Sequence, residues 1–111
     1  MIKIILAFKR REGMSAQEFK DYRRDVHAPL LFAIPEAKKI RRFVVNYPVA
    51  APGFPEPSYD AVVEAWFDSL HELTELYTCR NFVERVDPDH ANFIDLSSVG
   101  RVIVEEMVII E

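Results

Sequence analysis

The sequence predicts a single α+β domain over residues 1–111 with the element order β-α-β-β-α-β. Four segments carry the apolar or alternating pattern of strands. Two Ser-x-x-Glu sequences, which begin at Ser15 and Ser69, carry the pattern of a helix N-terminus whose free backbone amides are satisfied reciprocally. The composition, which is 50% hydrophobic and 12% aromatic, supplies a packed core and excludes a disordered chain.

Residues 2–30 predict the first strand and the first helix. Ile2–Phe8 is a nearly continuous apolar run rich in Ile, which is typical of a strand buried on both faces. After Ser15, apolar side chains recur at helical spacing: Phe19, Tyr22, Val26 and Leu30. Pro29 disfavours helical geometry at the residue before it, so this helix is predicted to end near His27.

Two strands separated by a long loop are expected next. Residues 40–47 alternate between two faces, and residues 60–67 alternate with one cleanly apolar face. Residues 48–58 hold four prolines and one glycine. They predict a surface loop of a length that is often functional.

The remaining residues predict a second helix and a last strand. Apolar side chains after Ser69 share one side of a helix: Leu70, Leu73, Leu76 and Tyr77. Residues 80–93 resemble short helical turns broken by Pro88, and residues 99–110 are expected to form a strand. This order is the ferredoxin-like arrangement, in which both helices lie on one face of an antiparallel sheet.

The sheet face without helices bears on the assembly. It would expose Val44, Val62 and Trp66 together with residues of the last strand. Such an apolar area is too large to stay wet on a small monomer. We therefore predict a homodimer that packs sheet face against sheet face. A pocket at or near this interface is the expected site for a small hydrophobic molecule.

Charge separates the two halves of the chain. The net charge of −4 argues against a general nucleic-acid surface, so no nucleic-acid partner is expected. Residues 1–42 carry 11 Lys and Arg against 5 Asp and Glu, whereas residues 43–111 carry 3 against 13. These charges are expected to pair within the fold, to pair between subunits, or to form an ordinary solvated surface.

Neither a membrane nor an oxidising compartment is expected. The longest apolar run near the N-terminus, Ile4 to Phe8, is far shorter than the roughly 20 residues that cross a bilayer, and it does not have the pattern of a signal peptide. Cys79 is the single cysteine, so it has no partner for an internal disulfide. A cytoplasmic location is therefore expected.

His27 is the first candidate catalytic residue. It lies at the predicted helix end, offset from the apolar stripe, and imidazole has the unperturbed pKa closest to neutral. Arg23 lies one turn earlier, where it would favour neutral imidazole, and is a candidate for substrate binding. The alternative is that His27 bonds a backbone carbonyl and closes the helix.

Glu64 is the second candidate catalytic residue, because it interrupts an apolar strand and shares a face with Trp66. Partial burial would raise the pKa of this carboxyl group. The alternative is an ion pair with Arg42 or Arg101 across the sheet. Trp66 is a candidate for the wall of the site or for the core. The tyrosines that flank the proline-rich loop are candidates to donate to an oxyanion: Tyr47 and Tyr59.

Motifs for common cofactors are absent. The chain contains no glycine-rich phosphate-binding motif and no nucleophile elbow. His27, His71 and His90 lack the spacing of a zinc site, and Cys79 has no neighbouring cysteine. No metal and no nucleotide cofactor is therefore expected. Cys79 is expected to be a small core residue rather than a nucleophile.

Several blocks of this sequence resemble the EthD family, which is named for ethyl tert-butyl ether degradation. They are residues 13–19, 22–30, 59–69 and 93–95, in that order. The resemblance implies a ferredoxin-like protomer that pairs through its sheet into a dimeric α/β-barrel, with a pocket in each protomer. The resemblance also implies that His27 belongs to the family's His-x-Pro pattern and that Glu64 occupies the family's acidic strand position. Arg23 stands where many members have Trp.

The resemblance and His27 together lead to one main hypothesis. A cofactor-independent enzyme of degradative or secondary metabolism acts on a hydrophobic, cyclic carbonyl compound, as an isomerase, a dehydratase or an oxidoreductase. His27 moves a proton at the carbon beside the carbonyl, Glu64 or a tyrosine orients it, and Trp66 forms an apolar wall. The alternatives are a non-catalytic binding or accessory protein, and a cofactor-free or haem-dependent monooxygenase with His27 or His90 as axial ligand.

Overall fold

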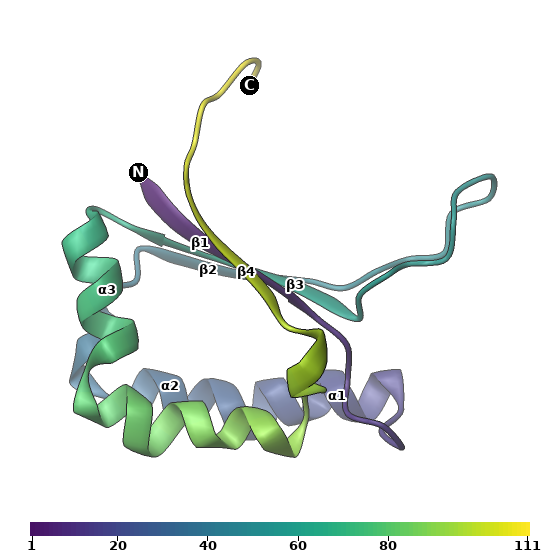
Figure 1. The fold of residues 1–111 in the computed structure, drawn as a ribbon, viewed down its shortest axis with the longest axis horizontal. Helices are drawn as coiled ribbons and strands as arrows, with labels where there is room; N and C mark the ends of the chain where they lie inside the picture. Colours follow the sequence, from purple (N-terminus) through teal and green to yellow (C-terminus); the bar gives the residue numbers. More distant parts are fainter.

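A four-stranded antiparallel sheet in the order β2-β3-β1-β4 organises the computed structural model, which describes all of residues 1–111 (Figure 1). The strands are β1 (Ile2–Phe8), β2 (Arg42–Asn46), β3 (Ala61–Phe67) and β4 (Gly100–Glu105). Because β1 pairs with both β3 and β4, it lies inside the sheet, and β2 and β4 form the edges. The α+β class and the ferredoxin-like order expected from the sequence are confirmed.

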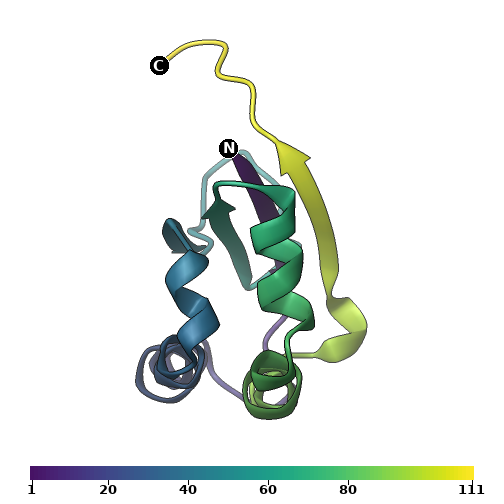
Figure 2. The same cartoon turned by 90° about the vertical axis from the view of Figure 1, so that its left-hand side faces the viewer.

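Two helical rods lie on one side of the sheet (Figure 2). The first contains α1 (Ala16–Tyr22), the π-helical turn η1 (Arg23–His27) and α2 (Ala28–Ala33), and a short 3-10 segment, η2 (Pro35–Lys39), follows it. The second begins with α3 (Leu70–Thr78), turns sharply at Cys79, whose backbone is extended, and continues with the π-helical turn η3 (Phe82–Val86) and the 3-10 turn η4 (Asp87–Asn92) (Figure 1). The turn η5 (Leu96–Ser98) leads into β4. None of these helices is both long and apolar enough to span a membrane.

Strand alternation gives the sheet a helix face and an open face. The helix face carries side chains that pack beneath the rods: Ile4, Leu6, Phe8, Phe43, Val45, Ala61, Val63, Ala65 and Phe67. On the edge strand β4 the same face carries Arg101 and Ile103, which are exposed. The open face carries the alternate positions: Lys3, Ile5, Ala7, Arg42, Val44, Asn46, Val62, Glu64, Trp66, Val102 and Val104. The two faces therefore present different environments to a ligand or a partner.

The first helical rod continues through Pro29, so its expected end near His27 is wrong. Proline has no backbone N–H and would break an ordinary α-helical hydrogen-bond ladder. Here the turn before it widens, and the N–H of Ala28 donates to the carbonyl of Arg23, five residues back. Pro29 then occupies the first turn of α2, where a missing N–H is tolerated. As a result His27 lies in the middle of the rod and is buried rather than projecting from an end.

The last strand ends at Glu105 rather than at the expected residue 110. Glu105 pairs with Ile2, the first residue of β1, so the chain beyond it has no strand to bond. Residues 106–111 lead away from the sheet (Figure 1). The long loop between β2 and β3 is confirmed, and it forms an arm that leaves the body of the domain (Figure 1).

The opposite charges of the two halves meet within the protomer. Five ion pairs join Lys or Arg of residues 1–42 to Asp or Glu of residues 43–111: Lys3–Glu64, Lys3–Glu106, Arg10–Asp60, Lys39–Glu75 and Arg41–Asp68. They link β1 and the segments that flank the first rod to β3, α3 and the C-terminal residues. Pairing within the fold thus engages four of the eleven cations of residues 1–42: Lys3, Arg10, Lys39 and Arg41.

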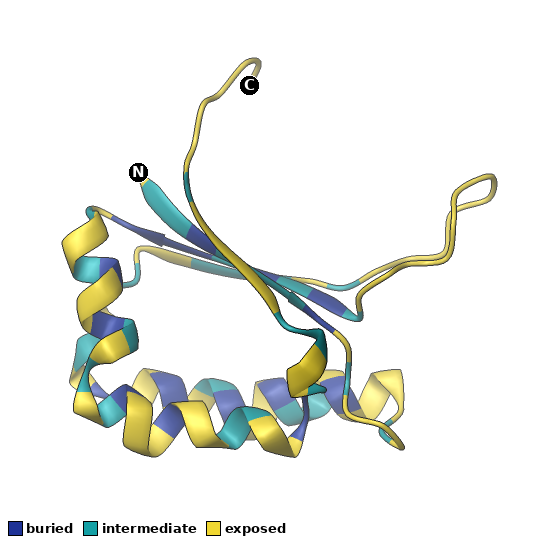
Figure 3. Cartoon of the chain, viewed as in Figure 1, coloured by how far each residue is buried: buried dark blue, intermediate teal, exposed yellow.

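Two apolar clusters lie between the sheet and the helices. The buried residues of the helices and strands are coloured dark blue in Figure 3. One is built around Phe67 and Leu76, under α3. The other is built around Phe8, Phe19 and Phe93, and its rings meet edge to face or tilted at centroid separations of 5.9 to 6.1 Å. Side chains of both clusters also line one cavity between them.

Candidate active site

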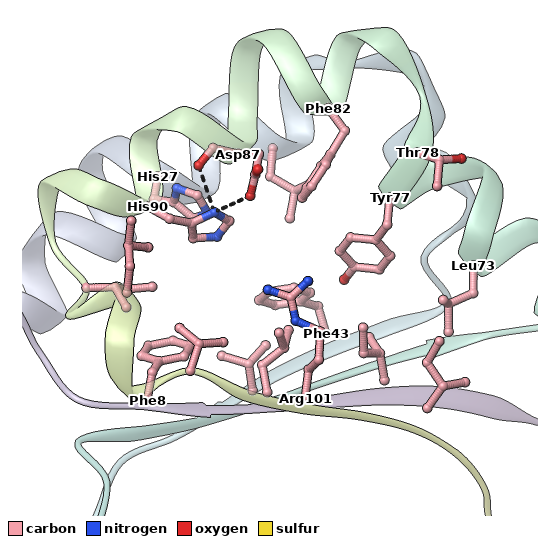
Figure 4. Close-up of a pocket in the computed structure, with 18 of the residues that line it drawn as sticks. Phe8, His27, Phe43, Leu73, Tyr77, Thr78, Phe82, Asp87, His90 and Arg101 are labelled. Atoms are coloured by element: carbon pink, nitrogen blue, oxygen red, sulfur yellow. Dashed lines mark hydrogen bonds and ion pairs between the residues drawn. The ribbon is translucent and has the colours of Figure 1, made fainter.

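A cavity of about 320 Å³ lies between the helix face of the sheet and the two rods (Figure 4). Its volume is at the lower end of the range for ligand pockets, and most of its lining is hydrophobic. The polar and charged residues in the lining come from both rods and from β4: Arg23, His27, Thr74, Tyr77, Thr78, Asp87, His90 and Arg101. The cavity is on the helix face, whereas the sequence analysis expected a pocket near the open face.

His27 enters this cavity from the π-helical turn, and its side chain is held by Asp89. Nδ1 of His27 lies 2.9 Å from Oδ2 of Asp89, and only 2% of His27 is exposed. Asp89 also accepts hydrogen bonds from the hydroxyl of Tyr22 at 2.6 Å and from the amide of Asn92 at 3.0 Å. An ionised carboxylate only accepts, so Nδ1 carries the proton and Nε2 keeps its lone pair.

The protonation states of this pair follow from burial and neighbouring charges. Burial lowers the pKa of His27 to about 4; repulsion from the protonated form of His90 and from Arg23 also lowers it, while Asp89 acts in the opposite direction. Burial raises the pKa of Asp89, but the hydrogen bonds from Tyr22, Asn92 and His27 outweigh it and hold the pKa below its usual value. At neutral pH the site therefore contains a neutral imidazole beside an ionised carboxylate.

A second histidine, His90, packs against the first with its ring tilted by 48°. The ring centroids of His27 and His90 are 4.4 Å apart, and both rings contact Phe93. Nδ1 of His90 lies 3.0 Å from the carbonyl oxygen of Asp87 and 3.1 Å from its carboxylate. Burial lowers the pKa of His90, although Asp87 raises it. The two imidazoles thus form a largely dry, neutral corner of the cavity.

Tyr77 supplies a hydroxyl group on another side of the cavity. Burial raises its pKa to about 12, so the phenol keeps its proton at neutral pH and can donate a hydrogen bond. Arg23 lines the cavity near the rings of Phe8 and Phe93, whose centroids lie 5.5 and 5.2 Å from its guanidinium carbon. The structure therefore brings His27 and Arg23 together, as two of the candidate site residues from the sequence.

Glu64 and Trp66 lie on the open face, away from this cavity. Glu64 pairs with Lys3 at 3.1 Å, not with Arg42 or Arg101 as the alternative proposed. The hydrogen bond from Lys3 lowers the pKa of Glu64, which corrects the expected rise. Trp66 lies between two cations, with Lys3 at 4.9 Å and Arg42 at 4.8 Å from its ring centroid. Neither residue contacts His27, since they project from the opposite side of the sheet.

The two loop-flanking tyrosines also lie outside the cavity lining. Tyr47 packs against Phe19 with its ring centroid 6.2 Å away, and Tyr59 is exposed on the arm. Sequence reasoning missed Asp89, Tyr77 and Arg101 as site residues. Asp-Pro-Asp-His at residues 87–90 was the available signal for the first, since it places two carboxylates beside a histidine. No group of three or more His, Cys, Asp or Glu side chains is placed to hold a metal ion.

The fold and the cavity define a class: a ferredoxin-like α+β protein with a histidine-lined, mostly apolar ligand cavity in the protomer. The EthD domain matches residues 11–97, and the chain belongs to the EthD family. It is 30% identical over 104 residues to the conidial pigment biosynthesis dehydratase EthD of Metarhizium robertsii, with 84% of this chain and 72% of that protein covered. It is 28% identical over 102 residues to the dehydratase aurZ of Gibberella zeae, covering 82% and 66%.

Solved structures agree with the fold. An ethyl tert-butyl ether degradation (EthD) family protein from Bacillus halodurans has a TM-score of 0.75 at 24% identity, over 96% of this chain and 99% of that one. A dimeric protein of unknown function with a ferredoxin-like fold from Bacteroides fragilis has a TM-score of 0.65 at 19% identity, over 95% of each chain. At these identities the likeness concerns the fold.

Proposed function

We propose that this protein is a small enzyme of degradative or secondary metabolism that dehydrates a hydrophobic, cyclic β-hydroxy carbonyl compound. The observation that carries the proposal is His27, a buried neutral imidazole whose Nδ1 is held by Asp89 in an apolar cavity. The related fungal proteins are dehydratases, not oxidoreductases. That relation favours dehydration among the reactions that the sequence left open.

The reaction needs one base and a hydrogen-bond donor. Nε2 of His27 takes the proton from the carbon beside the carbonyl, and the electron pair forms an enolate. The enolate collapses, the C–O bond at the β carbon breaks, and the leaving hydroxyl takes the proton from the His27 imidazolium. The products are the conjugated carbonyl compound and water, and His27 is neutral again. Asp89 stabilises the transient imidazolium, and the Tyr77 hydroxyl is a donor for the enolate oxygen.

A bicyclic β-hydroxy ketone tests the proposal. Loss of water from 3-hydroxy-1-tetralone gives 1-naphthol after tautomerisation, and the product is followed by its fluorescence. We expect the protein to accelerate naphthol formation over buffer, with saturation in substrate. Saturable binding of the ketone without naphthol formation and without exchange of its α-protons in D2O would contradict the enzyme and favour the non-catalytic binding alternative.

We also propose that the protein is a homodimer built through the open face. This face carries apolar side chains that the helices do not cover: Ile5, Ala7, Val44, Val62, Val102 and Val104. Val102 is 51% exposed in the protomer. Burial of this face against a second copy removes the apolar surface from water. A protein from Bacteroides fragilis with the same fold is dimeric, which supports a dimer here.

Val102→Glu is expected to separate the dimer. A carboxylate without a partner in the buried sheet interface raises the dimer dissociation constant by at least about 100-fold. Sedimentation velocity over a range of protein concentrations measures this change. Val83→Glu is the matched control, since Val83 is 50% exposed in η3 and lies outside the open face. A Val102→Glu protein that dimerises like the wild type would contradict the proposed interface.

A further inference from the structure

We infer that the substrate of this cavity carries a carboxylate, which Arg23 binds. The inference rests on the proposed function, because it names the substrate class of the same cavity. It starts from Arg23, a buried cation in the lining of a mostly apolar cavity.

Arg23 is a buried cation for which the protein supplies no anion. Only 6% of the residue is exposed, and Nε is inaccessible to solvent and has no hydrogen-bond partner. The Arg23 guanidinium takes part in none of the side-chain hydrogen bonds of the protein and in none of the protein's eleven ion pairs. A buried guanidinium without a partner is unfavourable, so such a group is retained where a ligand completes it.

The carboxylates nearest the cavity are already engaged. Asp89 accepts hydrogen bonds from Tyr22, Asn92 and His27, and Asp87 is bonded to His90. The other groups around Arg23 carry no negative charge at neutral pH: the phenols of Tyr47 and Tyr77, and the two imidazoles. No protein carboxylate is therefore free to pair with Arg23, and the anion of a ligand would supply that partner.

A second cation faces the same cavity from the sheet. Arg101 projects from β4 among the lining side chains (Figure 4), and it forms no ion pair and no hydrogen bond with another side chain. Most of the lining is hydrophobic, and Leu6, Phe8 and Val63 of the sheet contribute to it. A flat ring system suits these apolar side chains, and a carboxylate suits the planar fork of a guanidinium.

A charged and an uncharged ligand of the same shape test the inference. 2-Naphthoate and 2-naphthamide differ only in the group that Arg23 would bind, and both are titrated by isothermal calorimetry at low salt. We expect the wild-type protein to bind naphthoate at least about tenfold more tightly than the amide. Arg23→Met should remove this preference and leave the affinity for the amide nearly unchanged. Arg24→Met is the matched control, because Arg24 pairs with Asp21 and Asp25 at the surface.

Several outcomes would overturn the inference. They are naphthoate binding no tighter than the amide, no naphthoate binding at millimolar concentration, and a preference that survives in a folded Arg23→Met protein. If Arg23→Met fails to fold, Arg101→Met provides a second test, with a smaller loss of preference expected. His27→Gln should keep the preference for naphthoate. Failure of the carboxylate site is thus distinguishable from failure of the proposed chemistry, which concerns turnover alone.

Discussion

Replacing His27 by Gln is expected to lower the rate of naphthol formation from 3-hydroxy-1-tetralone by about 1,000-fold. General base catalysis by a positioned side chain contributes roughly 10² to 10⁴-fold, and His27, held by Asp89, is the base of the proposed reaction. Glutamine donates to Asp89 through its amide but cannot take a proton from carbon. Initial rates at saturating substrate measure the effect on kcat.

His71→Gln is the matched control for this substitution. His71 lies on the exposed surface of α3, where it contacts Glu75 at 3.3 Å, and it does not line the cavity. Its replacement should leave kcat within about twofold of the wild type. Thermal unfolding of both variants shows whether the fold is retained. A folded His27→Gln protein with wild-type kcat would refute the role of His27 as the base.

Replacing Asp89 by Asn has the second largest expected effect. Asparagine keeps the shape of the side chain but loses the negative charge that fixes the Nδ1–H form of His27 and stabilises the imidazolium. We expect kcat to fall by a factor of about 10² to 10⁴. The upper end is the loss of kcat that follows replacement of Asp by Asn in Ser-His-Asp enzymes. KM should change little, because Asp89 is a positioning residue that does not itself line the cavity.

The pH profile separates this positioning role from a loss of stability. The hydrogen bond from His27 to Asp89 raises the pKa of the imidazole, so its loss should move the acid limb of kcat/KM to lower pH. A variant that was only less stable would keep the wild-type limb and lose activity uniformly. Asp21→Asn, on the exposed face of α1, is the control, with kcat and acid limb unchanged. An Asp89→Asn protein with wild-type kcat would remove Asp89 from the mechanism.

The elements of this fold could be predicted from local patterns. Strand β3 was predictable from alternation, and the Ser15 and Ser69 side chains cap their helices. The reciprocal bond to the glutamate side chain forms only in the first motif, between Ser15 and Glu18. Two predicted boundaries were wrong, the end of the first helix and the end of the last strand. The first depends on a widened helical turn, and the second depends on pairing with a strand far away in the sequence. The π-helical turn carries the first rod past Pro29, and the pairing of Glu105 with Ile2 ends the last strand. Neither bond leaves a pattern in a single stretch of sequence.

The site was harder to predict than the fold. His27 and Arg23 were identified because they lie one turn apart in one predicted helix, next to the His-x-Pro pattern. Asp89 was missed because it meets His27 across 62 residues of chain, through the packing of two rods. Glu64 was placed correctly beside Trp66, but the cavity lies on the other face of the sheet. Alternation assigns a residue to a face, whereas the location of the cavity depends on how the helices cover that face.

The protonation of His27 is the central claim, and long-range ¹H–¹⁵N NMR of ¹⁵N-histidine-labelled protein tests it most directly. The spectrum distinguishes the two nitrogens of each ring, and His27→Gln assigns the signals. At neutral pH we expect Nδ1 of His27 to carry the proton and Nε2 to be unprotonated, with titration at about pH 4. A His27 ring that titrates near its ordinary value of 6.5, or that carries its proton on Nε2, would contradict the account.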